Sequence, residues 1–288
     1  MATLIKEDRN WVYTTDDVVE CQCDGVEECF VIGEEKLGEG GNAVVYKCQE
    51  RSTGEDFAIK IQVLNKGTHK ERFAREVRVL KAAEHEQLMS CRAVGELRLS
   101  YEKKIFECPY VIMPVAELNL KKLIEIRGRL PVEELNGQFC GMSDALAALH
   151  HTAIHRDIKP ENILIRGGAW VLSDFGLCKF LESDADSVDI TLDNEKIGPK
   201  YWMSPESMNR MLGNKDEIST ASDVFQMASV FWFAATGRHP TGIVSRADWS
   251  GPASLYDVLA SALSHSPGLR PKDGTDFHQK IEDAVRHA

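Results

Sequence analysis

The sequence predicts an α+β fold in which a β-rich N-terminal part is followed by a helical C-terminal part. From residue 30 to residue 63, short β-prone runs are broken by Gly-rich and Ser-Thr-Gly turns, as in an antiparallel meander. After Val115, apolar residues recur mainly at spacings of three and four, which is typical of helices. The two parts meet near residues 114–119. A composition of 43% hydrophobic and 27% charged residues indicates an ordinary globular protein of 288 residues.

The charge balance and the N-terminus exclude several function classes. The 34 basic and 45 acidic residues give a net charge of -11, so we expect no nucleic-acid partner, because phosphate backbones are bound by clustered Lys and Arg. The longest mostly apolar stretch, residues 224–236, is interrupted by Gln226 and is shorter than a membrane span. Residues 1–10 lack the apolar core of a signal peptide, and the scattered cysteines are typical of reduced thiols. The expectation is a cytoplasmic protein with no membrane partner.

Two β-prone runs between Val18 and Ile32 flank an Asp-Gly pair, which favours a tight hairpin turn. The hairpin carries Cys21, Cys23 and Cys29. A zinc site would need a fourth ligand and usually C-x2-C spacing, so packed strand cysteines are the favoured interpretation.

Residues 10–35 contain eight acidic residues and no basic residue. A solvated face is one interpretation of this pattern, and a docking surface for a basic partner is the other.

A glycine-rich run lies between two predicted strands, with the sequence Leu37-Gly38-Glu39-Gly40-Gly41-Asn42-Ala43-Val44-Val45. Glycines let backbone N–H groups approach phosphate oxygens closely, although a plain Gly-rich turn is the alternative. No helix follows the run, which argues against a dinucleotide-binding fold. Lys60 follows on a later strand. Burying it would be costly without a partner, and Glu76 is the candidate.

The remaining elements follow from periodicity. We predict a helix over residues 71–84, with Phe73, Val77, Leu80 and Ala83 on one face. Strands are predicted near residues 96–101 and 106–115. Residues 132–151 form the clearest helical pattern, and its apolar positions are Leu135, Phe139, Met142, Leu146 and Leu149.

The strongest chemical signal is His155-Arg156-Asp157-Ile158-Lys159-Pro160-Glu161-Asn162, followed by Ser173-Asp174-Phe175-Gly176. Phosphoryl transfer needs in-line positioning and neutralisation of charge. Asp157 can orient an attacking hydroxyl, and Lys159 can screen phosphoryl oxygens. Asn162 and Asp174 are oxygen donors suited to Mg2+.

With these motifs, residues 30–285 resemble the eukaryotic-type serine/threonine protein kinase family. The resemblance implies a bilobal kinase fold, with a small β-rich N-lobe carrying one regulatory helix and a larger helical C-lobe. It divides the chain into an N-terminal extension with the acidic hairpin (1–29), the N-lobe (30–115) and the C-lobe (116–288).

The resemblance also implies the site residues. Asp157, Lys159 and Asn162 would be catalytic, and Asn162 with Asp174 would bind Mg2+. Met113 would be the gatekeeper residue and Ala116 would offer its backbone to adenine. The full set expected around ATP is Leu37, Gly38, Gly40, Val45, Ala58, Lys60, Glu76, Met113, Ala116 and Leu164.

Other positions extend the match or depart from it. Glu206 of Ser-Pro-Glu would pair with Arg270, and Asp223 would open a central buried helix. Ala43 replaces the third glycine of the loop. Residues 240–254 leave little room for the family's αG helix, and Pro199 stands where Ser/Thr-specific members usually have Thr.

The implied function is ATP- and Mg2+-dependent transfer of the γ-phosphoryl group to Ser or Thr of protein substrates, with autophosphorylation. The net charge and Glu161 favour a basic substrate. A pseudokinase scaffold and a small-molecule kinase of related fold are the alternatives, and Lys60, Asp157 and Asp174 argue against the first. The sequence does not identify the oligomeric state.

The segment from residue 181 to residue 196 bears on regulation because it has six acidic residues against one lysine. One hypothesis is that Glu195 pairs with Arg156 in place of a phosphate. A solvated acidic loop is the alternative, and the phosphorylatable residues in this segment are Ser183, Ser187 and Thr191.

Overall fold

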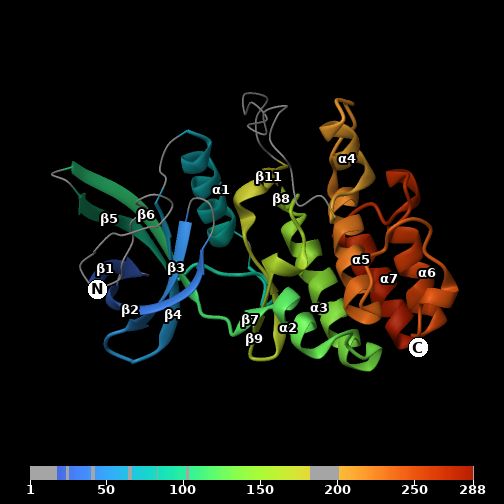
Figure 1. Ribbon diagram of the computed structural model, residues 1–288, viewed down its shortest axis with the longest axis horizontal. Coiled ribbons are helices and arrows are strands. Elements are labelled where there is room, and N and C mark those ends of the chain that lie inside the picture. Colours follow the sequence, from blue (N-terminus) through green and yellow to red (C-terminus); the bar gives the residue numbers. More distant parts are fainter. Residues whose placement is uncertain are drawn as a thin grey trace. The chain divides into compact units, whose positions relative to one another are not determined.

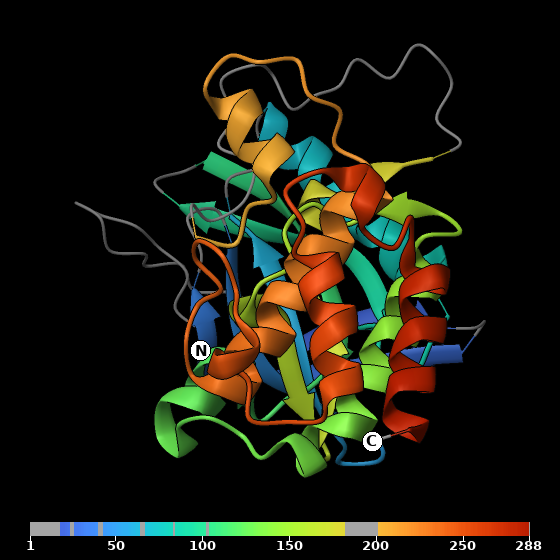
Figure 2. The same ribbon diagram turned by 90° about the vertical axis from the view of Figure 1, so that its right-hand side faces the viewer.

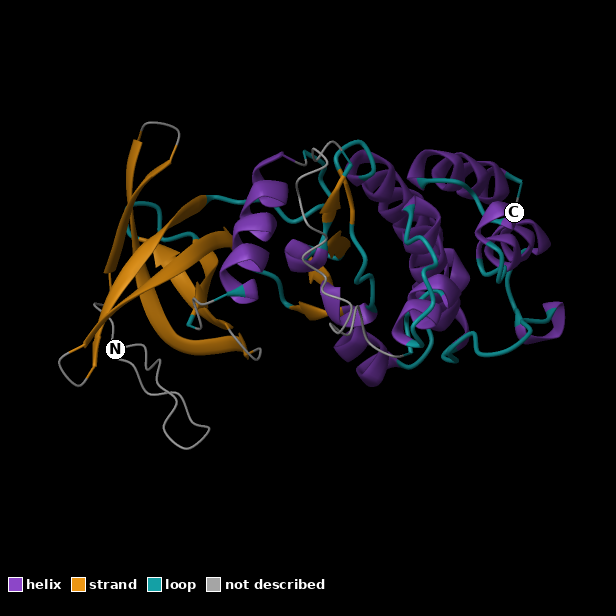
Figure 3. Cartoon of the chain, turned by 90° about the horizontal axis from the view of Figure 1, so that it is seen from above, coloured by secondary structure: helices purple, strands orange, loops and turns teal. Residues whose placement is uncertain are grey.

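The computed structural model describes residues 18–23, 26–39, 43–63, 67–82, 84–101, 104–181 and 201–287. Gly40, Pro199 and the predicted regulatory residues Ser183, Ser187, Thr191 and Glu195 lie outside these ranges. The chain divides into two compact units. The first unit comprises residues 1–81 and 89–116, and the second comprises residues 82–88 and 117–288. Strands dominate the first unit and helices the second (Figure 3), as the sequence predicts.

The first unit is built on a six-stranded antiparallel sheet with the order β1-β2-β3-β4-β6-β5 (Figure 1). The strands are β1 (Val18–Cys23), β2 (Val26–Glu39), β3 (Ala43–Glu50), β4 (Asp56–Gln62), β5 (Ala93–Tyr101) and β6 (Lys104–Pro114). The β1–β2 pairing confirms the predicted hairpin. Since β1 also contacts β5, the two edges of the sheet meet and the sheet curls around its core.

Side-chain alternation assigns the two faces of this sheet. One face holds the core, in which the rings of Phe30 and Phe57 meet edge to face at 5.4 Å, and Ile59 is fully buried. Because successive residues of a strand point to opposite faces, the neighbours Ala58 and Lys60 lie on the other face.

Helix α1 (Thr68–Ala82) confirms the predicted helix, but its buried face differs. Phe73 and Leu80 are buried as expected, whereas Val77 is only half-buried and Val79 is fully buried. Glu76 is buried as well. The face is rotated because it includes a charged residue, which an apolar periodicity cannot register.

The second unit is mainly helical. Its helices are α2 (Leu120–Arg127), α3 (Val132–Leu149), α4 (Pro205–Met211), α5 (Thr220–Thr236), α6 (Ala253–Ala262) and α7 (Gly274–Arg286). Two small sheets accompany them, one of β7 (Leu118–Asn119), β9 (Ile163–Arg166) and β10 (Ala169–Leu172), the other of β8 (Ala153–Ile154) and β11 (Lys179–Phe180).

Helix α7 packs along α3 and against α6 (Figure 2). All five apolar positions predicted for α3 are buried, and α5 is buried along most of its length, as predicted. Within the described ranges, no helix combines the length and the hydropathy needed to cross a membrane.

The segment between α5 and α6 contains no α-helix, which agrees with the limited room that the sequence predicts there. A single 3₁₀ turn, Arg246–Asp248, occupies it. Trp249 follows and is 4% exposed, with its ring 5.5 Å from that of Trp232 and its indole N–H donating to the Pro252 carbonyl. A packed tryptophan thus holds this connection in place.

Candidate active site

In the first unit, the sheet and α1 bring Lys60 and Glu76 together. Lys60 Nζ lies 2.6 Å from Glu76 Oε1 and 2.8 Å from Oε2. The two side chains are only 18% and 6% exposed. Because an enclosed pair is little screened by water, this ion pair fixes where the ammonium lies. The pairing predicted from the sequence is confirmed.

Several residues predicted to contact ATP lie in adjacent rows on that same sheet. Val45 is directly opposite Lys60 across the β3–β4 pair, and Ala58 is opposite Met113 across the β4–β6 pair. Gly38 is opposite Val45, and Leu37 beside it is 38% exposed.

Two further residues of the predicted set lie outside the six-stranded sheet. Ala116, two residues past β6, forms no hydrogen bond with any described residue, so its backbone groups are available. Leu164 belongs to the second unit, where it lies on β9 opposite Val171.

In the second unit, Asp157 gathers the other two predicted catalytic side chains around one of its oxygens. Lys159 Nζ donates to Asp157 Oδ2 at 2.8 Å, and Asn162 Nδ2 donates to the same oxygen at 2.9 Å. Asn162 Nδ2 also donates to the Asp157 carbonyl at 2.8 Å. The sequence motif therefore forms a compact site around a single carboxylate.

The second oxygen of this carboxylate is different. Asp157 Oδ1 is buried and accepts no hydrogen bond from any described residue. Leaving a buried acceptor unsatisfied costs about 1 to 3 kcal/mol, so such an atom in a native structure calls for an explanation. Burial raises the pKa of Asp157, against the opposing effect of the Lys159 charge. The site therefore offers a hydrogen-bond acceptor to a ligand.

The loop that carries Asp157 is held by α5. Asp223 accepts hydrogen bonds from the backbone N–H of His155 at 2.6 Å and of Arg156 at 2.8 Å. Gln226, one turn later, accepts from the backbone N–H of Ile158 at 3.1 Å. Arg156 adopts a left-handed conformation with φ of 71°, which is costly for a residue with a side chain. Two polar residues of a buried helix thus stabilise a strained loop.

Sequence reasoning missed this role of Asp223 and Gln226. Asp223 directly precedes the apolar stretch and Gln226 interrupts it. The two lie three residues apart, which places them on the same helix face. Since buried polar groups need hydrogen-bond partners, that spacing could have indicated that this helix face binds another polar segment.

The candidate metal ligands are linked through the backbone. Ser173 donates from both its N–H and its hydroxyl to the Asn162 carbonyl, each at 2.9 Å. Asp174 is the next residue, exposed and left-handed with φ of 63°. The Asn162 amide nitrogen faces Asp157, so its oxygen is directed elsewhere. An amide oxygen and a carboxylate suit Mg2+, which takes oxygen ligands.

Two contacts support the surroundings of the site, and the second of them is predicted from the sequence. The rings of His155 and Phe175 meet at 5.4 Å. Arg270 donates to both carboxylate oxygens of Glu206 at 2.8 and 2.9 Å, and both side chains are almost wholly buried.

The sequence comparisons agree with this geometry. Residues 32–251 match the model of the protein kinase domain. The chain is 28% identical to MAP kinase kinase mkk-4 of Caenorhabditis elegans, over 85% of this chain and 63% of that protein. It is 29% identical to the serine/threonine-protein kinase PrkC of Bacillus subtilis, over 86% of this chain and 39% of that protein. The chain is 31% identical to the serine/threonine-protein kinase pkn2 of Myxococcus xanthus, over 81% of this chain and 28% of that protein.

The chain therefore belongs to the protein kinase family. It spans between about a quarter and two thirds of the length of these three relatives.

Proposed function

We propose that this chain is an ATP- and Mg2+-dependent protein kinase that phosphorylates Ser and Thr residues of protein substrates, including its own. The observation that carries the proposal is the carboxylate of Asp157. One of its oxygens is fixed by Lys159 and Asn162, and the other is buried and has no partner among the described residues.

In this mechanism Asp157 Oδ1 accepts the hydrogen bond of the acceptor hydroxyl and aligns its oxygen for in-line attack. As the new oxygen–phosphorus bond forms and the bond to the leaving group breaks, the carboxylate takes the hydroxyl proton. The Asp157 pKa, raised by burial, makes the carboxylate a better proton acceptor than an exposed aspartate. Lys159, which contacts the same carboxylate, would neutralise charge on the oxygens of the phosphoryl group.

The first unit would supply the nucleotide contacts. Lys60, held by Glu76, is suited to a phosphate. Val45, Ala58, Met113 and Leu37 offer apolar surface to adenine, Gly38 and Gly40 offer backbone N–H groups, and Ala116 offers its N–H and C=O. Leu164 would complete the adenine contacts. Asn162 and Asp174 would hold Mg2+, which would supply neutralisation of the charge that develops on the phosphates.

The proposal also covers the acceptor residues, the charge of the substrate, the bounds of the domain and the cellular location. Lys159 two residues after Asp157 is the serine/threonine pattern, and two of the relatives described above are named serine/threonine-protein kinases. A basic substrate fits the net charge of -11. We place the kinase domain at about residues 30–285, with lobes of 30–115 and 116–288 after the extension 1–29, and the protein in the cytoplasm.

The test is Asp157→Asn, assayed with ATP, Mg2+ and a degenerate peptide library read by mass spectrometry. Removing the proton acceptor should lower turnover by about 10² to 10⁴-fold. The control is Glu133→Gln on the exposed surface of α3, which should leave turnover unchanged. A folded Asp157→Asn variant with activity within about threefold of wild type would refute the assignment.

A further inference from the structure

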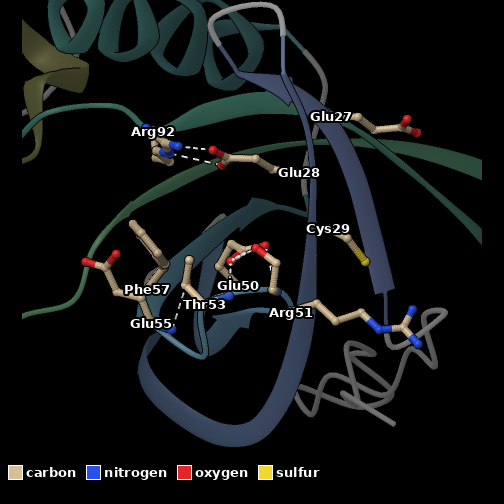
Figure 4. A pocket seen from close by; sticks show the side chains of 10 residues that line it. Glu27, Glu28, Cys29, Glu50, Arg51, Thr53, Glu55, Phe57 and Arg92 are labelled. Atoms are coloured by element: carbon tan, nitrogen blue, oxygen red, sulfur yellow. Dashed lines mark hydrogen bonds and ion pairs between the residues drawn. The ribbon is translucent and has the colours of Figure 1, made fainter.

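The first unit has a cavity of about 510 Å³ at the ends of β2, β3 and β4 (Figure 4). None of the residues that line it belongs to the proposed active site. Its charged lining consists of Glu27, Glu28, Glu50, Glu55, Arg51 and Arg92. The remaining wall includes the ring of Phe57 and the thiol of Cys29.

Two of the four carboxylates already have internal partners. Glu28 forms an ion pair with Arg92 through both guanidinium nitrogens Nε and Nη2. Glu50 accepts hydrogen bonds from the Ser52 N–H at 2.9 Å and the Thr53 N–H at 2.6 Å, and these bonds hold its pKa at about 2. Glu28 and Glu50 therefore have a structural role in the wall of the cavity.

The other two carboxylates, Glu27 and Glu55, are exposed and form no ion pair or side-chain hydrogen bond with any described residue. Arg51 is the one lining cation in the described part of the chain without an ion pair. In Figure 4, Glu27 and Arg51 extend away from the Glu28–Arg92 pair. The cavity therefore presents an excess of unneutralised negative charge.

The exposed face of the β1–β2 hairpin adjoins the cavity and carries one apolar pair. Val18 and Val31 are directly opposite each other and remain 38% and 37% exposed. One step along the same face, Glu20 is opposite Cys29, and Glu27 follows. One exposed valine pair thus lies beside Glu20 and Glu27 on this face.

We propose that this cavity and the adjoining hairpin face dock a segment of a partner protein that contains both basic residues, arginine or lysine, and apolar residues. Charge complementarity supports that occupant, because the described residues 18–23 and 26–35 carry five acidic residues and no basic one. The valine pair and Phe57 provide contacts for the apolar residues. Opposite charges at such a surface mainly speed association and are weakened by salt. Docking here is independent of phosphoryl transfer.

The probe is a fluorescent ten-residue peptide of alternating Arg and Leu, with a Glu–Leu peptide as its counterpart. Fluorescence anisotropy with the full chain should show binding of the first only, weakening between 50 and 300 mM salt. Glu27→Gln/Glu55→Gln should weaken binding at least tenfold. The matched control Glu86→Gln/Glu133→Gln removes two exposed carboxylates from the second unit and should leave the affinity within twofold.

The thiol of Cys29 provides a readout at the site itself. The Arg–Leu peptide should slow alkylation of Cys29 by N-ethylmaleimide at least fivefold, resolved by peptide mass spectrometry. Cys140 on α3, also half-buried, should be alkylated at an unchanged rate.

Absence of binding, an equal loss in the control variant, or an unprotected Cys29 would each overturn the proposal. Since neither measurement involves nucleotide, failure here is separate from failure of the kinase assignment.

Discussion

At the residue scale, the burial of the Asp157 carboxylate suits its proposed function but lowers the stability of the fold. The residue is 5% exposed, and one of its carboxylate oxygens has no partner among the described residues. Burial disfavours the charged form of an acid, so the folded protein holds this proton more tightly than the unfolded chain does. The charged form of Asp157, which the proposed mechanism requires, therefore destabilises the folded protein.

This argument predicts a pH-dependent stability difference for Asp157→Asn. A folded-state pKa above the unfolded value of 3.8 means that stability is lost as the pH rises through the folded pKa. At pH 7 the variant should have a Tm equal to or above that of wild type, and its advantage should shrink as the pH approaches 4. Thermal unfolding by circular dichroism at pH 7, 5.5 and 4 tests this. A variant less stable at pH 7 than at pH 4, each relative to wild type, would contradict it.

At the element scale, α3 and α7 approach each other through Gly274. A Cβ there would lie 2.4 Å from the backbone nitrogen of Ala147, and the Gly274 N–H donates to His150 Nδ1. Backbone atoms cannot give way as the end of a flexible side chain can. The helix pair therefore depends on the absence of a side chain at this position.

We predict that Gly274→Ala destabilises the protein by more than 1 kcal/mol, because overpacking in a close contact typically costs about 1 to 3 kcal/mol. Gly137→Ala on α3 is the matched control. It has no atom within 4 Å of the new Cβ and should stabilise by about 0.5 to 1 kcal/mol through helix propensity. Chemical denaturation measures both. Equal effects of the two changes would refute the close-contact argument.

A second element-scale prediction concerns the ion pair that joins α4 to Arg270. Glu206→Gln leaves the buried guanidinium without its counter-charge, which typically costs about 3 to 5 kcal/mol. Arg127→Gln breaks the exposed pair with Glu134, where both side chains are about half exposed, and should cost less than about 1 kcal/mol. Thermal unfolding should separate the two variants clearly, and similar Tm values would show that burial does not set the strength of the Glu206 pair.

The elements also show what sequence alone can predict. The hairpin, α3 and the Asp157 motif follow from local patterns, because turn chemistry, helical period and reaction chemistry each fix residue types at short spacing. Asp223 could not be assigned its role in this way, since its partners are backbone N–H groups 67 and 68 residues earlier. The apolar pattern predicts the buried face of α1 with Val77 in place of Val79, because it does not register the ion pair of Glu76 that determines the orientation.

At the scale of the whole molecule, the proposed function includes a preference for Ser and Thr as acceptors. Lys159 two residues after Asp157 is the pattern of Ser/Thr-specific family members, whereas Pro199 departs from the Thr that those members usually have. Because Lys159 contacts Asp157 directly, we expect phosphoserine and phosphothreonine in both the peptide library and the protein itself. Phosphopeptide mapping tests this, with Asp157→Asn as the blank, and a map dominated by phosphotyrosine would overturn it.

The curled sheet of the first unit also determines how short a fragment of this chain can be and still fold. The match to the kinase domain begins at residue 32, yet the core includes Val19 and Phe30, which precede it. The match ends at residue 251, before Arg270 and the whole of α7. A fragment trimmed to the matched residues would expose the ring of Phe57 and leave Glu206 buried without its guanidinium. The shortest autonomously folding piece of this protein is therefore longer than the segment by which its ancestry is recognised.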